Sequence, residues 1–97
     1  MYQHETAKLR AMTRSPRFRM VLTDHAEERM EQHDIARFEV EKVLKAGAVV
    51  MIDMEPDGTE TWRVAGRDAD GARIEVVIEP IPPPSEMAVV ITVIRVG

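Results

Sequence analysis

The sequence predicts an α+β fold in which two α-helices pack on one face of a four- to five-stranded antiparallel sheet. Apolar residues recur at helical spacing between residues 23 and 46, and short apolar or alternating segments fill the chain after Gly47. Turn-forming sequences such as Pro56-Asp57-Gly58 separate these later segments, and connections this short join antiparallel neighbours. The helices need a surface for their apolar stripes, and one face of the sheet provides it.

Residues 1–15 are predicted to form a basic arm or an optional helix ahead of a single domain at 16–97. The apolar spacing in the first segment is weak, and Pro16 disfavours helical geometry at the residue before it. Residues 18–22 alternate between apolar and mostly basic side chains, which is typical of an edge strand. A chain of 97 residues is long enough for one domain with a modest core.

The first predicted helix begins at an N-cap, Thr23 or Asp24, and runs to about His33. Thr and Asp are favoured at this position because their side-chain oxygens accept hydrogen bonds from the first turn. Asp34 is expected to take a left-handed or turn conformation, which Asp tolerates better than most residues.

The second predicted helix spans about residues 36–46 and ends at Gly47, a residue suited to the end of a helix. Ala36, at the predicted start, has no side-chain oxygen that could cap the helix. Phe38 falls away from the apolar stripe, so it is either exposed or covered by the arm or a second subunit.

Strands are expected after Gly47 at residues 48–54, 60–66, 73–79 and 87–96. The last is apolar on both faces, which indicates a central strand or one that a partner covers. The face of the sheet toward the core is predicted to carry Val50, Ile52, Met54, Trp62, Val64, Ile74, Val76 and Ile78.

Composition narrows the function classes. The chain has no cysteine, which excludes disulfides, cysteine nucleophiles and thiolate metal sites. No apolar run approaches the ~18 residues of a membrane span, so we expect a cytoplasmic protein without membrane contact. Residues 1–22 carry five basic and one acidic residue, whereas residues 23–97 carry eight basic and sixteen acidic residues. The acidic body argues against sequence-independent binding of nucleic acid.

The first predicted helix places His25 and Arg29 one turn apart, at the margin of its buried stripe. A half-buried His and Arg pair is the kind of environment that catalysis or anion binding needs. The alternative is structural, with both residues capping the sheet and pairing with nearby carboxylates. His25 and His33 are about two turns apart, too far to share one ion. No metal or cofactor is therefore predicted.

Arg63 and Arg73 are predicted to lie on adjacent strands and to point away from the core. Two arginines on an open sheet face could bind phosphate oxygens. The alternative is ion pairing with Asp53 and Glu75, predicted for the same face together with Thr61, because cross-strand charge pairs are common.

The pattern Thr23-x-His25-Ala26-x-x-Arg29-Met30 is followed by Ile35, which opens a second helix ending at Val43-Leu44, and by a closing strand over residues 90–95. Together these features resemble a small bacterial family of domains of unknown function that is grouped with the RelE/ParE-like toxins and is close to BrnT. The resemblance covers about residues 17–96, and its most specific part is the His-Ala-x-x-Arg-Met segment. Two departures are His33-Asp34 where the family often has Arg-Gly, and Ala36 in the cap.

This resemblance implies a toxin of a type II toxin–antitoxin system, with an antitoxin as partner and RNA, the ribosome or gyrase as target. The matching positions are His25 and Arg29 on the first helix and Thr92 and Arg95 on the last strand. In a metal-independent ribonuclease acting on mRNA, His25 could be the base or acid, with His33 as a second acid–base group. Arg29 and Arg95, with Arg63 or Arg73, could stabilise the developing charge.

A second function class stays open, a non-catalytic protein-binding module with the same fold. The two-sided apolar last strand and Phe38 favour an interface, formed either with a second copy as a homodimer or with an antitoxin-like partner.

Overall fold

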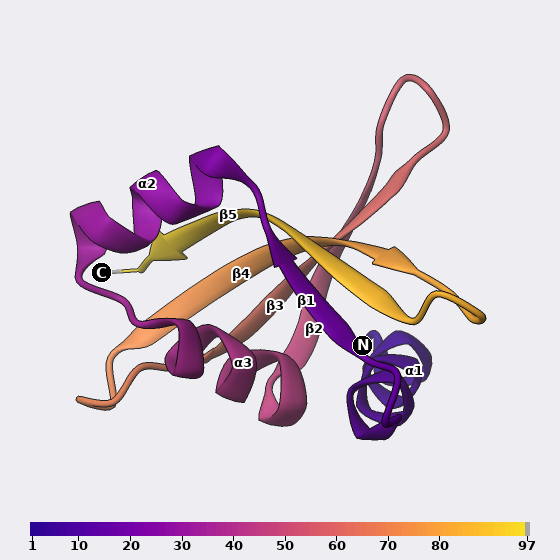
Figure 1. The fold of residues 1–97 in the computed structure, drawn as a ribbon, viewed down its shortest axis with the longest axis horizontal. Helices are drawn as coiled ribbons and strands as arrows, with labels where there is room; N and C mark the ends of the chain where they lie inside the picture. The colour runs from indigo at the N-terminus through magenta and orange to yellow at the C-terminus, as the bar shows by residue number, and fades with distance from the viewer. Residues whose placement is uncertain (97) are drawn as a thin grey trace.

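The computed structural model describes residues 1–96 and shows an α+β domain with a five-stranded mixed sheet (Figure 1). The strands lie in the order β1-β5-β4-β3-β2. The elements in chain order are α1 (Gln3–Arg14), β1 (Arg19–Leu22), α2 (Asp24–His33), α3 (Arg37–Ala46), β2 (Ala48–Met54), β3 (Glu60–Arg67), β4 (Arg73–Ile81) and β5 (Met87–Arg95).

The sheet is mixed because β1 lies parallel to β5, with Met20 opposite Ala88. The prediction of an antiparallel sheet is correct for β2 to β5 and wrong for β1. Short loops require antiparallel neighbours, but most of the chain separates β1 from β5, so loop length does not decide their direction. β1 is an edge strand, as the alternation predicted.

The first segment forms a third helix, one of the two options that the sequence left open. Leu9 of α1 is 1% exposed and belongs to the same core as the other helices. Arg10 donates to the carbonyl oxygen of Ala46 at the end of α3 (3.1 Å), and Thr6 Oγ1 accepts from the main-chain N–H of Val49 (3.0 Å). α1 therefore packs beside α3 and covers the beginning of the β2 edge (Figure 1).

The next two helices begin and end close to where their capping residues predicted. Thr23 Oγ1 accepts from the main-chain N–H of Ala26 (3.1 Å), and Asp34 has a left-handed φ of 54°. Ala36 cannot offer a side-chain cap, but Glu39 Oε1 accepts its main-chain N–H at 2.8 Å. This bond supplies half of a capping box and offsets part of the missing cap.

The core lies between the three helices and one face of the sheet. Five residues predicted for the core face are buried: Trp62, Val64, Ile74, Val76 and Ile78. Val50 and Met54 are instead 38% and 65% exposed, and Ile52 is partly buried, so the prediction was wrong at the ends of β2. A β-bulge shifts the register between Val49 and Met51, which puts Val49 in the core and turns Val50 outward.

The opposite face of the sheet has no helix packed on it within residues 1–96. Its central side chains are partly buried and mixed in character, and they include Val77, Val89, Thr92 and Ile94. Of the two options for the last strand, a central position is the one found, because β5 pairs with β1 on one side and β4 on the other. A partner could therefore reach β5 through this uncovered face and not through its edges.

Candidate functional site

His25 and Arg29 lie on the solvent side of α2. The helix buries Ala26 and Met30 in the core, while both candidate residues are exposed rather than half-buried. Arg29 Nη1 donates to Gln32 Oε1 at 3.4 Å and has no carboxylate partner among residues 1–96. No hydrogen bond or ion pair in that part of the chain joins either residue to Arg95.

Arg95 is held by structural partners. Its Nη1 forms an ion pair with Asp68 Oδ2 at 2.6 Å, and its Nη2 donates to the main-chain carbonyl of His33 at 2.7 Å. The guanidinium thus connects three parts of the fold, the end of α2, the β3–β4 turn and β5. Glu39 reinforces the same turn, because its Oε2 accepts the main-chain N–H of Ala69 at 2.7 Å.

Asp68 is a buried carboxylate whose charge the surrounding groups stabilise. The hydrogen bond from Arg95 is the main reason why the pKa of Asp68 lies below its ordinary value of 3.8. Burial acts in the opposite direction, and the main-chain N–H groups of Ala72 and Asp70 lower the pKa further. The pair is therefore a fixed ionic contact within the fold.

This contact predicts an acid-dependent loss of stability. The pKa of Asp68 is lower in the folded chain than its ordinary value. Its contribution to the free energy of unfolding is therefore fully present above about pH 3.8 and is lost as the pH falls through the folded pKa. We expect the stability difference between wild type and Asp68→Asn to be largest near neutral pH and to shrink below pH about 4. Urea unfolding measured across this pH range checks it, with Asp70→Asn as the exposed control. A difference that is constant from neutral to acid pH would contradict the prediction.

Arg63 and Arg73 converge on one carboxylate. Arg63 Nη1 lies 3.5 Å from Glu75 Oε1, and Arg73 Nη2 lies 3.0 Å from Glu75 Oε2. Glu75 is buried, and Arg63 Nε is a buried donor that has no partner in the described chain, residues 1–96. The predicted adjacency is therefore found, with Glu75 as the ion-pair partner that the alternative named. Phosphate binding by this pair stays a prediction.

The two candidate residues of the last strand face opposite ways. Thr92 pairs with Val77 on the uncovered face, whereas Arg95 pairs with Ile74 on the core face. The bulge near Val77 does not bring them together. The residues matched by the toxin resemblance therefore occupy three places, the exposed side of α2, the Asp68 contact and the uncovered sheet face.

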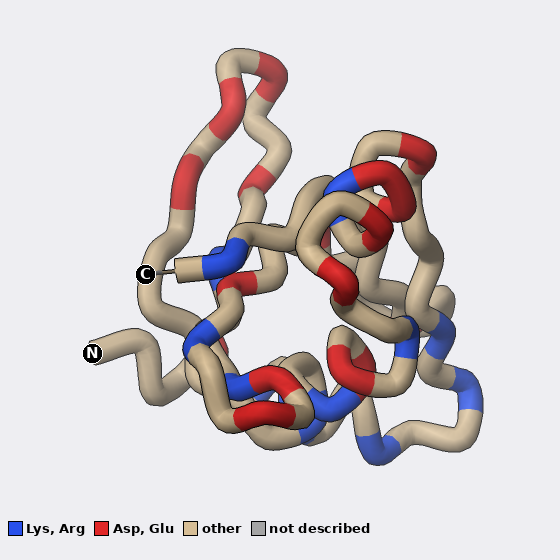
Figure 2. The backbone as a smooth tube through the Cα atoms, turned by 90° about the vertical axis from the view of Figure 1, so that its left-hand side faces the viewer, with Lys and Arg blue, Asp and Glu red and all other residues tan. Residues whose placement is uncertain are grey.

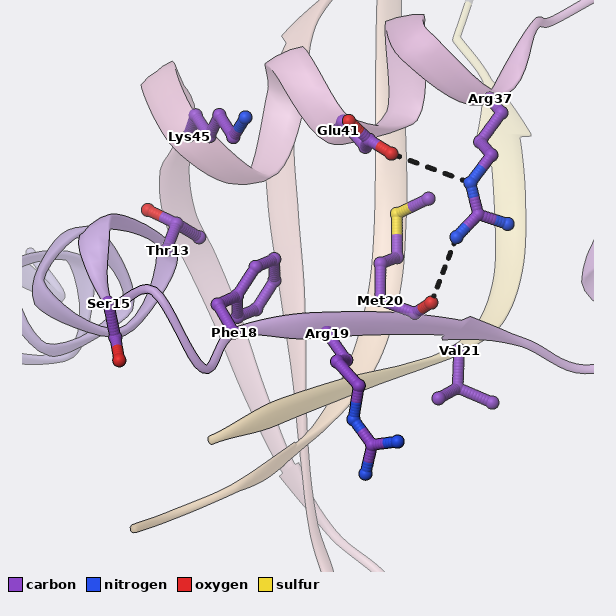
Figure 3. Close-up of a pocket in the computed structure, with 9 residues that line it drawn as sticks. All are labelled: Thr13, Ser15, Phe18, Arg19, Met20, Val21, Arg37, Glu41 and Lys45. Atoms are coloured by element: carbon purple, nitrogen blue, oxygen red, sulfur yellow. Dashed lines mark hydrogen bonds and ion pairs between the residues drawn. The ribbon is translucent and has the colours of Figure 1, made fainter. Parts of the chain in front are cut away.

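A cleft that the sequence analysis missed lies between β1 and α3 (Figure 3). It holds about 460 Å³, and Figure 3 shows the side chains of Phe18, Glu41 and Lys45 around its opening. The full lining is Thr13, Ser15, Phe18, Arg19, Met20, Val21, Arg37, Glu41 and Lys45. The four-residue spacing of the charged residues on α3 was the available signal, because it places them on one helix face. Neither His25 nor Arg29 lines this cleft.

A second cleft of about 470 Å³ lies between α1 and the proline-rich segment before β5. Trp62 and Pro80 contribute to its wall, and Trp62 Nε1 donates to Glu60 Oε1 at 2.7 Å. Within residues 1–96, His, Asp and Glu side chains do not gather in threes as a metal ion would need. None of the three helices is long and apolar enough to cross a bilayer.

Charge is distributed unevenly over the molecule. In Figure 2, Asp and Glu gather on the β2–β3 hairpin at upper left, and Lys and Arg gather at lower right on the loop between α1 and β1. The acidic hairpin residues are Asp53, Glu55, Asp57 and Glu60, and the basic loop residues are Arg14, Arg17 and Arg19. The hairpin at one edge of the sheet is thus acidic, and the loop that leads into β1 at the other edge is basic.

Comparison with known proteins gives one family. No curated protein and no solved structure showed significant similarity to the chain. Residues 22–95 match the family described as Domain of unknown function (DUF4258). This match begins at the end of β1 and ends with Arg95, and so includes α2, α3 and the four antiparallel strands. Because it spans well over half of the sequence, the chain belongs to the DUF4258 family.

Proposed function

We propose that this chain is a protein-binding module, which acts by pairing with itself or with an antitoxin-like partner and does not cleave RNA. The observation that carries the proposal is that three of its arginines form ion pairs within the fold. Arg63 and Arg73 contact Glu75, and Arg95 contacts Asp68, so three arginines that could have bound phosphate are already paired with buried carboxylates.

Catalysis of RNA cleavage would require free arginine and histidine side chains gathered around one phosphate, and these ion pairs do not leave such a group. Charge stabilisation in a transition state depends on donors that are preorganised around the reacting phosphate and shielded from water. His25 and Arg29 are exposed on α2 and line neither of the two clefts described above. Recruiting Arg95 would leave Asp68 buried without its counter-ion, which is costly, and recruiting Arg63 would leave Glu75 with Arg73 alone as its ionic partner.

Surface features support a binding role. Val21 and Met51 are exposed on the uncovered face of the sheet, and Val77, Val89 and Ile94 are partly exposed there. Phe38 is 64% exposed on α3. Exposed apolar groups that lie together on one surface are a feature of interaction sites.

The second candidate is the toxin of a type II toxin–antitoxin system, a metal-independent endoribonuclease acting on mRNA, free or on the ribosome. One observation favours it. Arg29 has no carboxylate partner within residues 1–96 and lies one helical turn from His25, which could transfer protons near neutral pH. An antitoxin would then be the protein that covers this side of α2.

A growth assay separates the two candidates. The wild-type chain and the variants His25→Ala, Arg29→Ala and Glu28→Ala are induced from a tightly repressed promoter and matched for soluble expression. The binding-module proposal predicts equal growth for all four cultures, because under it His25 and Arg29 perform no chemistry. Glu28→Ala is the matched control, since it alters an exposed residue of the same helix.

Growth arrest by the wild type and by Glu28→Ala, with relief in both other variants, would overturn the proposal and favour the toxin. Sequencing of RNA ends from the arrested cells would then distinguish RNA cleavage from inhibition of gyrase.

A further inference from the structure

The β2–β3 hairpin is an acidic arm. It projects away from the body of the domain in Figure 1, at upper right, and its tip lies between Met54 and Glu60. Residues 50–61 hold four carboxylates and no Lys or Arg. Met54 is exposed at the base of the tip. An isolated two-stranded hairpin is marginally stable, so an arm of this kind gains stability by packing on another surface.

The cleft beside β1 has the complementary character. Its lining contains two basic residues on α3, Arg37 and Lys45, and one acidic residue, Glu41, whereas the side chain of Arg19 points to the other side of β1 (Figure 3). The apolar side chains of Phe18 and the buried Met20 also line it (Figure 3). An acidic segment with an apolar side chain would therefore find both opposite charge and apolar contact there.

The cleft also offers an unpaired strand edge. The main-chain N–H groups of Arg19 and Thr23 donate toward the β5 side, each at 3.2 Å. Backbone groups alternate in direction along a strand, so those of Met20 and Leu22 face the cleft. Arg37 Nη2 donates to the carbonyl of Met20 at 3.1 Å, as Figure 3 shows, and so occupies an acceptor that an added strand could use.

Arg37 can leave this position at little cost. Its other ionic contact is an exposed pair with Glu41 at 3.4 Å, between residues four apart on α3. Exposed pairs of this kind contribute little to stability. Once displaced, Arg37 would stand about two helical turns from Lys45 on the wall of the cleft (Figure 3), and each could pair with an incoming carboxylate.

We propose that the cleft between β1 and α3 binds the acidic β2–β3 hairpin of a second copy of this chain. The proposal rests on the proposed binding function and names its partner. β1 and β2 are the two opposite edges of one sheet, so a chain cannot place its hairpin in its own cleft. A second copy brings an acidic edge to a basic edge. Because the surfaces differ, the contact is heterologous, and further copies can add unless two chains dock reciprocally.

Sedimentation velocity of the full chain tests this assembly. Between about 10 μM and 1 mM protein, we expect the average mass to rise with concentration in about 50 mM NaCl and to fall back toward monomer in about 500 mM NaCl. Two charge-reversal variants, Asp53→Lys/Glu55→Lys in the hairpin and Arg37→Glu/Lys45→Glu in the cleft, should each weaken self-association roughly tenfold or more.

An equimolar mixture of the two variants is the decisive measurement. The unaltered hairpin of the cleft variant meets the unaltered cleft of the hairpin variant, and the two reversed surfaces also match, so the mixture should associate where neither variant does alone. Glu28→Lys/Glu31→Lys on α2 is the control, because it changes net charge as much as the hairpin variant without touching either surface. Circular dichroism checks that each variant is folded.

A wild type that stays monomeric throughout would overturn the hairpin proposal but leave a different protein partner as the proposed function. Association that persists in both reversal variants would also overturn it, and would place self-pairing on another surface such as the uncovered sheet face. Growth arrest relieved by His25→Ala remains the result that overturns the proposed function.

Discussion

Replacing Gly47 with alanine is expected to destabilise the fold by about 3 kcal/mol or more, because the new methyl group has no space. Gly47 joins α3 to β2, where its N–H donates to the carbonyl of Val43 at 2.7 Å. A Cβ at this position would lie 2.5 Å from that same carbonyl oxygen and even closer to the carbonyl oxygen of Ala65 on β3. Both atoms belong to the main chain, so relief requires α3 or the β2–β3 pair to move.

The measurement is urea unfolding of Gly47→Ala beside Gly58→Ala. Gly58 has a φ of +87° and no atom within 4 Å of an added Cβ, so alanine there meets backbone strain alone, about 1–2 kcal/mol. We expect the midpoint to fall further for Gly47→Ala than for Gly58→Ala. The reverse order would mean that the helix–sheet connection is looser than this packing indicates.

The sequence predicted the elements well where local chemistry sets their limits. α2 begins after Thr23, whose side chain caps it, and ends before Asp34, which is left-handed. α3 ends before Gly47. Each of these signals lies within a few residues of the boundary that it sets. Turn-forming residues between the strands act equally locally, so the limits of β2, β3 and β4 were also close to those predicted.

Features that depend on distant partners were not predictable in the same way. The direction of β1 is set by its pairing with β5, which lies at the far end of the chain. The bulge near Val50 places Val49 instead of Val50 in the core, and a simple alternation rule has no means of placing it. Both errors arise from tertiary pairing, which acts after local propensities have been satisfied.

The candidate site shows the same distinction. Spacing along α2 correctly placed His25 and Arg29 on one side of the helix, but it could not show that this side is exposed. The adjacency of Arg63 and Arg73 followed from strand order, and their common partner Glu75 was among the alternatives. The contact of Arg95 with Asp68 joins residues far apart in sequence, so spacing gave no sign that this arginine is structural.

Leu9→Ala is expected to lower the free energy of unfolding by about 2–5 kcal/mol, the usual cost of emptying a buried leucine site. Leu9 is the anchor of α1 in the common core, and its loss would also loosen the contact of Thr6 with the β2 edge. Because α1 covers the start of this edge, fraying of α1 would expose main-chain groups of β2 that another chain could pair with. The prediction therefore joins two effects, a lower urea midpoint and faster amide hydrogen exchange at Val49.

Lys8→Ala is the matched control, since Lys8 is an exposed neighbour in the same helix and should change stability by less than about 0.5 kcal/mol. If Leu9→Ala left both the midpoint and the exchange rate unchanged, α1 would unfold independently of the sheet. The segment would then behave as the basic arm that the sequence offered as the alternative to a helix. A loss of stability together with faster exchange at Val49 would instead place α1 in the cooperative unit, because one leucine then secures both the core and the sheet edge.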